Sequence, residues 1–181
     1  MALERDRLLG LFTTEQHSAF GLVMESINSN RSCNVFAVLA SAGCGKTVFA
    51  NGLAAAVRAQ GRSAICVAAS ALAAMLLLGG TTSHSKFHIP IPANDGTVCH
   101  FSSAERDMIR HADIILYDEC SMVHHDVADT VCAYVCVCVC VCVCVCVCVC
   151  VCVCVGVLAC WRVGVLACWR VGVFARARAC D

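Results

Sequence analysis

The stretch Val35-Phe-Ala-Val-Leu-Ala-Ser-Ala-Gly-Cys-Gly-Lys-Thr47 decides the fold of this 181-residue chain. Its first six residues form an apolar run of the length of a buried strand, and a loop with two glycines follows directly. The alanine-rich segment from Val48 to Gln60 then has the composition of a helix and is followed by Gly61, a residue typical of helix C-termini. Strand, glycine loop and helix in this order predict a βα unit of an α/β protein.

The loop has the composition of a phosphate-binding loop (P-loop). Backbone N–H groups around the glycines can point at phosphate oxygens, and the start of the helix adds positive partial charge. Lys46 can reach the β and γ phosphates of a nucleotide, and the Thr47 hydroxyl can ligate Mg²⁺. The loop departs from the pattern G-x-x-x-x-G-K-[ST] at Ala40, which takes the place of the first glycine. The candidate ATP-binding residues here are Ala42, Gly43, Cys44, Gly45, Lys46 and Thr47.

An acidic pair follows a later strand. Residues 114–117 are apolar and of strand length, and Asp118 and Glu119 stand at their carboxyl end. Downstream of a phosphate loop, Asp118 can hold Mg²⁺ and Glu119 can orient or deprotonate the water that attacks the γ phosphate. The candidate catalytic residues are therefore Lys46, Asp118 and Glu119, with Thr47 and Asp118 at the metal.

The remaining segments of residues 1–130 complete an α/β pattern. Thr13 and Gln16 fit a capping box before a helix that ends near Ser26 or Asn28. Further expected elements are a strand over 63–69, a helix over 70–78, an extended connection over 89–92 and a helix capped by Ser102 and Glu105 that runs to about His111. We expect a mostly parallel sheet flanked by helices, the fold of P-loop NTPases.

Composition changes sharply near residue 131. The whole chain balances 13 basic against 13 acidic residues, so no bulk charge attracts nucleic acid or anionic membranes. Residues 1–130 have five scattered cysteines with no CxxC pair, which excludes a disulfide scaffold and indicates a reducing compartment. Charges at residues 4–7 interrupt the start before any apolar run, so we expect no signal peptide. The expected division is a motor domain over 1–130 and a low-complexity tail over 131–181.

The tail has the pattern of translated repeat DNA. Residues 135–155 alternate Val and Cys without exception, as an alternating GT tract would encode, and the octapeptide VGVLACWR then occurs twice. We therefore expect an irregular tail. Two functional interpretations stay open: a transmembrane span over the uncharged residues 131–160, or a strand with all cysteines on one face that binds metal. The physical consequence we expect is an uncharged, proline-free, β-prone segment that aggregates or is degraded.

Several blocks of residues 11–129 resemble ATP-dependent DNA helicases of the petite-integration-frequency type (PIF-one-like), a superfamily-one group with RecD-like motor domains. The blocks are FTTEQHSAF (12–20), ASAGCGKT (40–47), VAASALAA (67–74), GGTTSHSKFHIPI (79–91) and ADIILYDECSM (112–122). The block around His84 to Ile91 is the most specific to that family. The resemblance implies ATP-dependent DNA unwinding in repair, recombination and telomere maintenance, with ATP and Mg²⁺ as cofactors and an intracellular, nuclear or mitochondrial, location.

The resemblance also implies roles for individual residues. Gln16 would contact the adenine edge, since an amide can donate and accept at once; its other role, capping a helix, is compatible with this. Ser70, Ser83 and His84 would lie near the path of single-stranded or forked DNA. Stacking platforms for bases are few, with only Phe87 and Phe101 nearby. No specific protein partner is implied.

The resemblance ends before the second motor domain of that family, which supplies an arginine finger. The tail arginines belong to the repeats and cannot be assigned this role. Without the arginine, hydrolysis would lose about 10³ to 10⁵ in rate, so we expect this chain to be a truncated fragment limited to nucleotide binding. The alternatives are a non-functional truncated or pseudogene product whose tail aggregates or associates with membranes, and a P-loop ATPase of the transport or replication-loader type.

Overall fold

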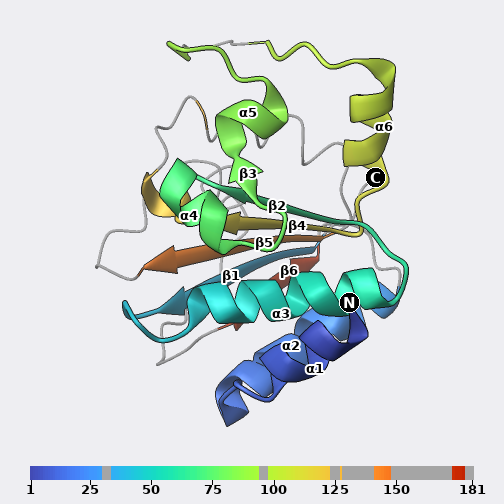
Figure 1. The fold of residues 1–181 in the computed structure, drawn as a ribbon, viewed down its shortest axis with the longest axis vertical. Coiled ribbons are helices and arrows are strands. Elements are labelled where there is room, and N and C mark those ends of the chain that lie inside the picture. Colours follow the sequence, from blue (N-terminus) through green and yellow to red (C-terminus); the bar gives the residue numbers. More distant parts are fainter. Residues whose placement is uncertain (30–33, 94–97, 123–126, 128–140, 148–172, 178–181) are drawn as a thin grey trace.

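A computed structural model of the protein describes residues 1–29, 34–93, 98–122, 127, 141–147 and 173–177. Over these residues the chain forms one central sheet with helices on both faces (Figure 1). The α/β class expected from the sequence is confirmed.

The central sheet is parallel except at one edge. In spatial order its strands are β3 (Thr81–Thr82), β2 (Ala64–Ala68), β4 (Ile114–Asp118), β5 (Val141–Val147), β1 (Asn34–Ala40) and β6 (Val173–Ala177). Neighbours from β3 to β1 pair in parallel, and β6 pairs antiparallel with β1. Because β1 and β4 run parallel on either side of β5, Ala40 and Asp118 end their strands at the same edge of the sheet.

Helices that the sequence marks with capping residues begin where they were predicted. Thr13 and Gln16 form the predicted capping box of α2, and Ser102 and Glu105 form that of α6. Two short helices, α1 and α5, and a single 3-10 turn over Cys120–Met122 were not predicted. The bounds are α1 Ala2–Leu9, α2 Thr14–Asn28, α3 Lys46–Ala59, α4 Ala71–Leu76, α5 Ser83–Phe87 and α6 Ser103–Arg110.

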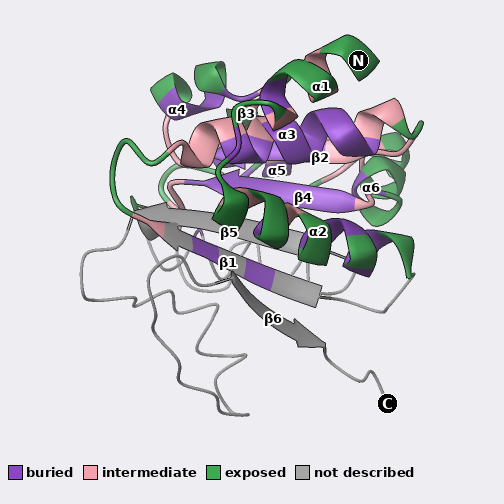
Figure 2. Ribbon diagram, turned by 90° about the horizontal axis from the view of Figure 1, so that it is seen from below, coloured by how far each residue is buried: buried purple, intermediate pink, exposed green. Residues whose placement is uncertain are grey.

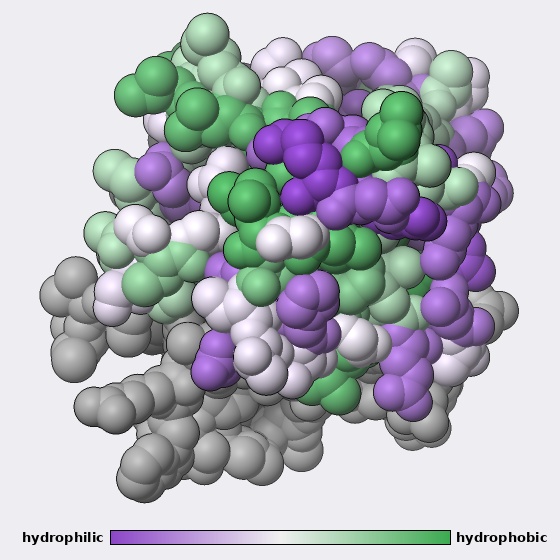
Figure 3. Space-filling model, turned by 60° about the horizontal axis from the view of Figure 1, so that its bottom comes forward, coloured by the Kyte–Doolittle hydropathy of each residue, from purple (hydrophilic) through white to green (hydrophobic). Residues whose placement is uncertain are grey.

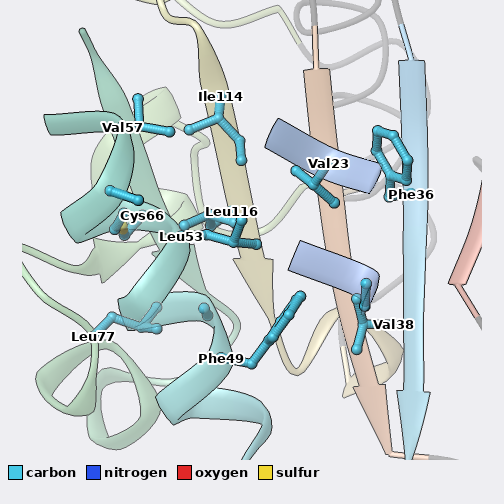
Figure 4. Close-up of a cluster of buried hydrophobic side chains, with 14 of the residues drawn as sticks. Val23, Phe36, Val38, Phe49, Leu53, Val57, Cys66, Leu77, Ile114 and Leu116 are labelled. Atoms are coloured by element: carbon cyan, nitrogen blue, oxygen red, sulfur yellow. The ribbon is translucent and has the colours of Figure 1, made fainter. Parts of the chain in front are cut away.

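The side chains of β2 and β4 divide between two cores. On one face Cys66, Ile114 and Leu116 pack against α2 and α3, where Val23 and Leu53 are fully buried (Figure 4). Burial of such a side chain contributes about 1.5–3 kcal/mol each. This core therefore fixes α3, the helix that starts at the phosphate loop, against the sheet.

The opposite face is covered by α5 and α6. There the alternate residues of the same strands, among them Val67 and Ile115, pack against Phe87 of α5 and Ile109 of α6. Figure 2 shows the resulting pattern, with buried residues concentrated in α3 and β4. Alternate side chains of β4 thus pack against the helices on the two faces of the sheet, and both layers fix the strand that ends at Asp118.

One helix leaves an apolar face at the surface. Leu72, Met75 and Leu76 share a face of α4 and are 73%, 82% and 62% exposed, while Ala73 and Ala74 point into the core. Figure 3 shows that hydrophobic side chains also gather in patches on one face of the molecule, beside hydrophilic ones.

The tail departs from the irregular structure expected for it in two places. Residues 141–147 of the Val-Cys repeat form β5, inside the sheet between β4 and β1, and residues 173–177 form the edge strand β6. A strict two-residue period suits a strand, and a paired position in a sheet satisfies its backbone groups. The rest of the tail, including most of the proposed transmembrane stretch over 131–160, lies outside the described residues. Within the described part, no helix is long and apolar enough to span a membrane and no cluster of three metal-ligating side chains occurs.

Candidate functional site

The phosphate loop connects β1 to α3 at the edge where Ala40 and Asp118 end their strands. Residues 41–44 are exposed. Gly43 and Gly45 have φ angles of 77° and 74°, in the left-handed region that favours glycine. The loop therefore needs both glycines for its conformation, and α3 begins immediately after Gly45.

Lys46 folds back over this loop. Its ammonium donates hydrogen bonds to the carbonyl oxygens of Ala40 at 2.9 Å and Ser41 at 2.8 Å. The charged group is thus held beside the exposed loop by acceptors that a phosphate oxygen can replace.

Thr47 and Asp118 meet across the sheet edge. The Thr47 hydroxyl donates to Asp118 Oδ2 at 3.2 Å, although 71 residues separate the two in sequence. Asp118 is only 5% exposed, and its other oxygen accepts the backbone N–H of Glu119 at 2.9 Å. Hydroxyl and carboxylate oxygens of this kind are the protein ligands that Mg²⁺ prefers.

Glu119 has an unusual backbone and an unexpected partner. Its φ angle is 54°, a left-handed conformation that is uncommon for residues other than glycine. Its carboxylate oxygen Oε2 accepts a hydrogen bond from the Ser70 hydroxyl at 3.3 Å. A candidate catalytic residue and a candidate DNA-binding residue are therefore in direct contact.

Gln16 is bonded through both ends of its side-chain amide. Its oxygen accepts the Thr13 N–H at 3.0 Å, and its nitrogen donates to the carbonyl of Cys44 at 3.0 Å. The Gln16 nitrogen also lies 3.3 Å from where a Cβ on Gly45 would be. Gln16 therefore fastens the start of α2 to the phosphate loop, and its contact with adenine stays a prediction.

Ser83 and His84 lie at the start of α5 beside a hollow of about 280 Å³. The hollow is lined by these two residues and by Ala69, Ile91 and Met122, among others. Ser83 is 1% exposed, and its hydroxyl has no hydrogen-bond partner among the residues that the structure describes. Ala69 precedes Ser70, so Ser70 adjoins the hollow that His84 and the buried Ser83 line.

Phe87 does not provide the stacking platform that its position in sequence suggested. It is fully buried in the core under α5, where it packs with Ile89 and Ile109. Phe101 is half-buried and its ring makes an edge contact with that of His88, with centroids 5.8 Å apart. Base stacking on Phe87 is thus excluded by the packing of the core.

Comparison with models of protein families assigns the chain to a family. The family model described as PIF1-like helicase matches residues 11–137, which is more than half of the chain. The chain belongs to the PIF1-like helicase family. None of the curated proteins matches the sequence.

Solved structures of Pif1 helicases have the same fold. A structure described as DNA unwinding at forked dsDNA by two coordinating Pif1 helicases is 25% identical, with a TM-score of 0.59 over 76% of this chain and 33% of the other. Bacteroides Pif1 in complex with ADP-AlF3 and ssDNA is 26% identical, with a TM-score of 0.58 over 75% of this chain and 32% of the other. The Pif1 helicase of Candida albicans shows the fold at 18% identity, with a TM-score of 0.56 over 74% of this chain and 32% of the other.

This PIF1-like chain therefore spans about a third of the length of the solved helicases it matches. Its phosphate loop, acidic pair and Gln16 all fall within the matched residues 11–137. The sequence does not predict the contacts of Gln16 with Cys44 or of Ser70 with Glu119, because both join segments that are far apart in the chain.

Proposed function

We propose that this chain binds ATP together with Mg²⁺ at the loop of residues 40–47, as the nucleotide-binding part of a DNA helicase motor. The observation that carries the proposal is the hydrogen bond between Thr47 and Asp118 at 3.2 Å, beside the exposed loop. It brings a hydroxyl and a buried carboxylate together at the edge where the glycine loop begins. Two left-handed glycines, and a lysine ammonium beside them whose carbonyl partners a phosphate oxygen can replace, fit a bound phosphate chain.

In this proposal each residue of the site has a defined role in binding or hydrolysis. The Lys46 ammonium gives up its hydrogen bonds to the loop carbonyls and donates instead to the β and γ phosphate oxygens. The backbone N–H groups of residues 42–45 also contact the phosphates. Thr47 and Asp118 hold Mg²⁺, which neutralises charge on the phosphates when bound. Glu119 orients the attacking water, and Gln16 keeps the loop in place and contacts the adenine.

The proposed nucleic acid partner is single-stranded or forked DNA. It would pass over Ser70, Ser83 and His84, beside the hollow of about 280 Å³. Support comes from the family and from relatives whose structures are described with ssDNA and forked dsDNA. We further propose that the full-length motor unwinds DNA in repair, recombination or telomere maintenance, in the nucleus or mitochondrion.

We also propose that residues 1–130 form the motor domain apart from its strand β5, and that residues 131–181, which supply this strand, are repeat-derived. The change in composition at residue 131 and the strict Val-Cys alternation support this division.

The metal pair can be tested by titrating the full chain with a fluorescent ATP analogue, in Mg²⁺ and in EDTA. Thr47→Val and Asp118→Asn should each weaken binding about tenfold in Mg²⁺ and have little effect in EDTA, because only metal-dependent contacts are lost. Thr14→Val, at an exposed first residue of α2, is the matched control. Equal losses in Mg²⁺ and EDTA would contradict the metal assignment.

The DNA assignment can be tested by fluorescence anisotropy with a labelled single-stranded oligonucleotide. His84→Ala should weaken binding about fivefold, whereas His100→Ala, at an exposed position outside the hollow, should not. Equal affinities of the wild type and His84→Ala would argue against the proposed path.

A further inference from the structure

The Ser70 hydroxyl lies between the proposed DNA path and Glu119 of the acidic pair, to which the proposed function gives different roles. It donates to Glu119 Oε2 at 3.3 Å and accepts the backbone N–H of Ala73 at 3.2 Å. Ser70 is thereby the N-cap of α4, and its side chain is fixed from the helix side. The only proton of the hydroxyl points to Glu119.

The order of the strands shows on which side of β4 the bond from Ser70 holds the Glu119 carboxylate. β2, which precedes Ser70, pairs with β4 on the side away from β5 and β1. The phosphate loop follows β1, so it lies on the other side of β4. A Glu119 carboxylate bonded to Ser70 is therefore drawn toward β2 and away from the loop that would hold the γ phosphate.

The backbone around this pair is tightly joined. The N–H of Ala69 donates to the carbonyl of Asp118 at 3.3 Å, which extends the pairing of β2 with β4 to the residue before Ser70. Glu119 follows in a left-handed conformation, and its backbone N–H donates a hydrogen bond to the side chain of Asp118. Rotation of the Glu119 side chain, rather than movement of the backbone, is thus the low-cost way for the carboxylate to leave Ser70.

The other end of α4 is tied to the helix that carries the phosphate loop. The Asn51 side chain donates to the carbonyl of Leu76 and accepts the N–H of Leu78, both at 2.8 Å. Arg58 donates to the carbonyl of Leu78 at 2.7 Å. Because both residues belong to α3, the position of Ser70 is fixed relative to the nucleotide site from both ends of α4.

We propose that Ser70 is a positioning residue that restrains the Glu119 carboxylate on the β2 side of the sheet until another hydrogen-bond acceptor takes the Ser70 hydroxyl. The inference rests on the proposed function, in which Glu119 serves the attacking water and single-stranded DNA passes over Ser70. A phosphate of that DNA is an acceptor, and the single proton of Ser70 cannot serve it and Glu119 together. DNA at Ser70 therefore frees Glu119 to turn toward the phosphate loop.

The test compares full-chain wild type, Ser70→Ala, Ser70→Gly and Ser70→Thr in the hydrolysis of ATP labelled at the γ phosphate, with and without a single-stranded oligonucleotide. The labelled phosphate makes even the slow turnover of a chain without the arginine finger measurable. Ser70→Ala should raise the DNA-independent kcat about tenfold, leave KM within about twofold, and reduce stimulation by DNA toward one, because the restraint is gone. Ser70→Thr keeps a hydroxyl and should restore the wild-type values. Ser70→Gly removes the hydroxyl while retaining a tolerated N-cap residue, so it replaces Ser70→Ala if that variant does not fold.

Ser102→Ala is the matched control, because it removes the N-cap of α6 without touching the acidic pair. It should lower the free energy of unfolding as Ser70→Ala does, and leave kcat unchanged both without and with the oligonucleotide. The inference is overturned if the two hydroxyl-free variants at Ser70 behave like Ser102→Ala, if they lower kcat, or if the wild type binds Mg²⁺ and ATP without turnover. Absence of Mg²⁺-dependent ATP binding by the wild type would instead overturn the proposed function, which the binding titration detects separately.

Discussion

At the residue scale, the polar groups of the nucleotide site are already hydrogen-bonded to the protein itself. The Lys46 ammonium is held by Ala40 and Ser41, the Thr47 hydroxyl by Asp118, and the Gln16 amide by Thr13 and Cys44. A ligand must exchange these bonds rather than add to them, so the net gain per contact is well below the strength of an isolated hydrogen bond.

Gln16 gives the most specific prediction at this scale. Gln16→Ala removes both the capping bond to Thr13 and the bond to the loop carbonyl of Cys44, whereas Thr13→Ala removes only capping. Both variants should lose about 1 kcal/mol in the free energy of unfolding by urea. Only Gln16→Ala should also weaken binding of an ATP analogue, by about fivefold, because the loop loses its tie to α2. Equal affinities for the two variants would show that the tie has no role in binding.

At the element scale, the caps determine how well the sequence predicts the structure. α2 and α6 were predicted because a capping box is a local signal, complete within four residues. The strands of residues 34–40, 64–68 and 114–118 were predicted from apolar runs bounded by polar or glycine residues. The left-handed Glu119 and its bond to Ser70 were not, because they depend on which strands become neighbours in the sheet.

The cap of α6 leads to a pH prediction. Hydrogen bonds from the Ser102 side chain and backbone, and then from His88 at 2.7 Å, lower the pKa of Glu105 from 4.5 to about 2. A carboxyl whose folded pKa is lowered stabilises the fold above its unfolded pKa, and this contribution is lost as pH falls from about 4.5 through about 2. Ser102→Ala should therefore raise the Glu105 pKa toward 4.5 in a carbon NMR titration of the side chains.

Glu4 is the internal control for this titration. A hydrogen bond from Arg7 lowers the pKa of Glu4, and that pair lies in α1, away from Ser102. Its midpoint should be the same in both proteins. A Glu105 midpoint that stays near 2 in Ser102→Ala would show that the hydroxyl is not the main cause of the shift.

At the scale of the whole molecule, a segment of the Val-Cys alternation lies within the sheet, between β4 and β1. The parallel pairs of β5 with β4 and with β1 join the strand that ends at Asp118 to the strand that precedes the phosphate loop. The sequence gives no indication of this, since a uniform Val-Cys alternation has no feature that fixes its register or its neighbours. The two halves of the site are therefore connected through residues 141–147.

Proline substitution can test this arrangement. Val143→Pro removes a backbone donor in a strand that is paired on both sides, opposite Phe36 and Leu116. It should lower the unfolding free energy by about 1–3 kcal/mol, because a ladder hydrogen bond is lost and its acceptor is left unpaired. Ala175→Pro lies in the edge strand β6 and should cost much less. Urea denaturation followed by circular dichroism gives both values. Equal stabilities would contradict a central position of β5.

The central claim is that this chain holds ATP at the loop of residues 40–47, and the most direct measurement is the affinity of the full chain for an ATP analogue in Mg²⁺. The two lysines of the sequence, Lys46 and Lys86, provide the comparison. Lys46→Ala should weaken binding about a hundredfold, because a charged contact to the phosphates is lost, and Lys86→Ala, whose ammonium lies against Met108, should bind like the wild type. Unchanged affinity in Lys46→Ala, or an equal loss in Lys86→Ala, would contradict the account.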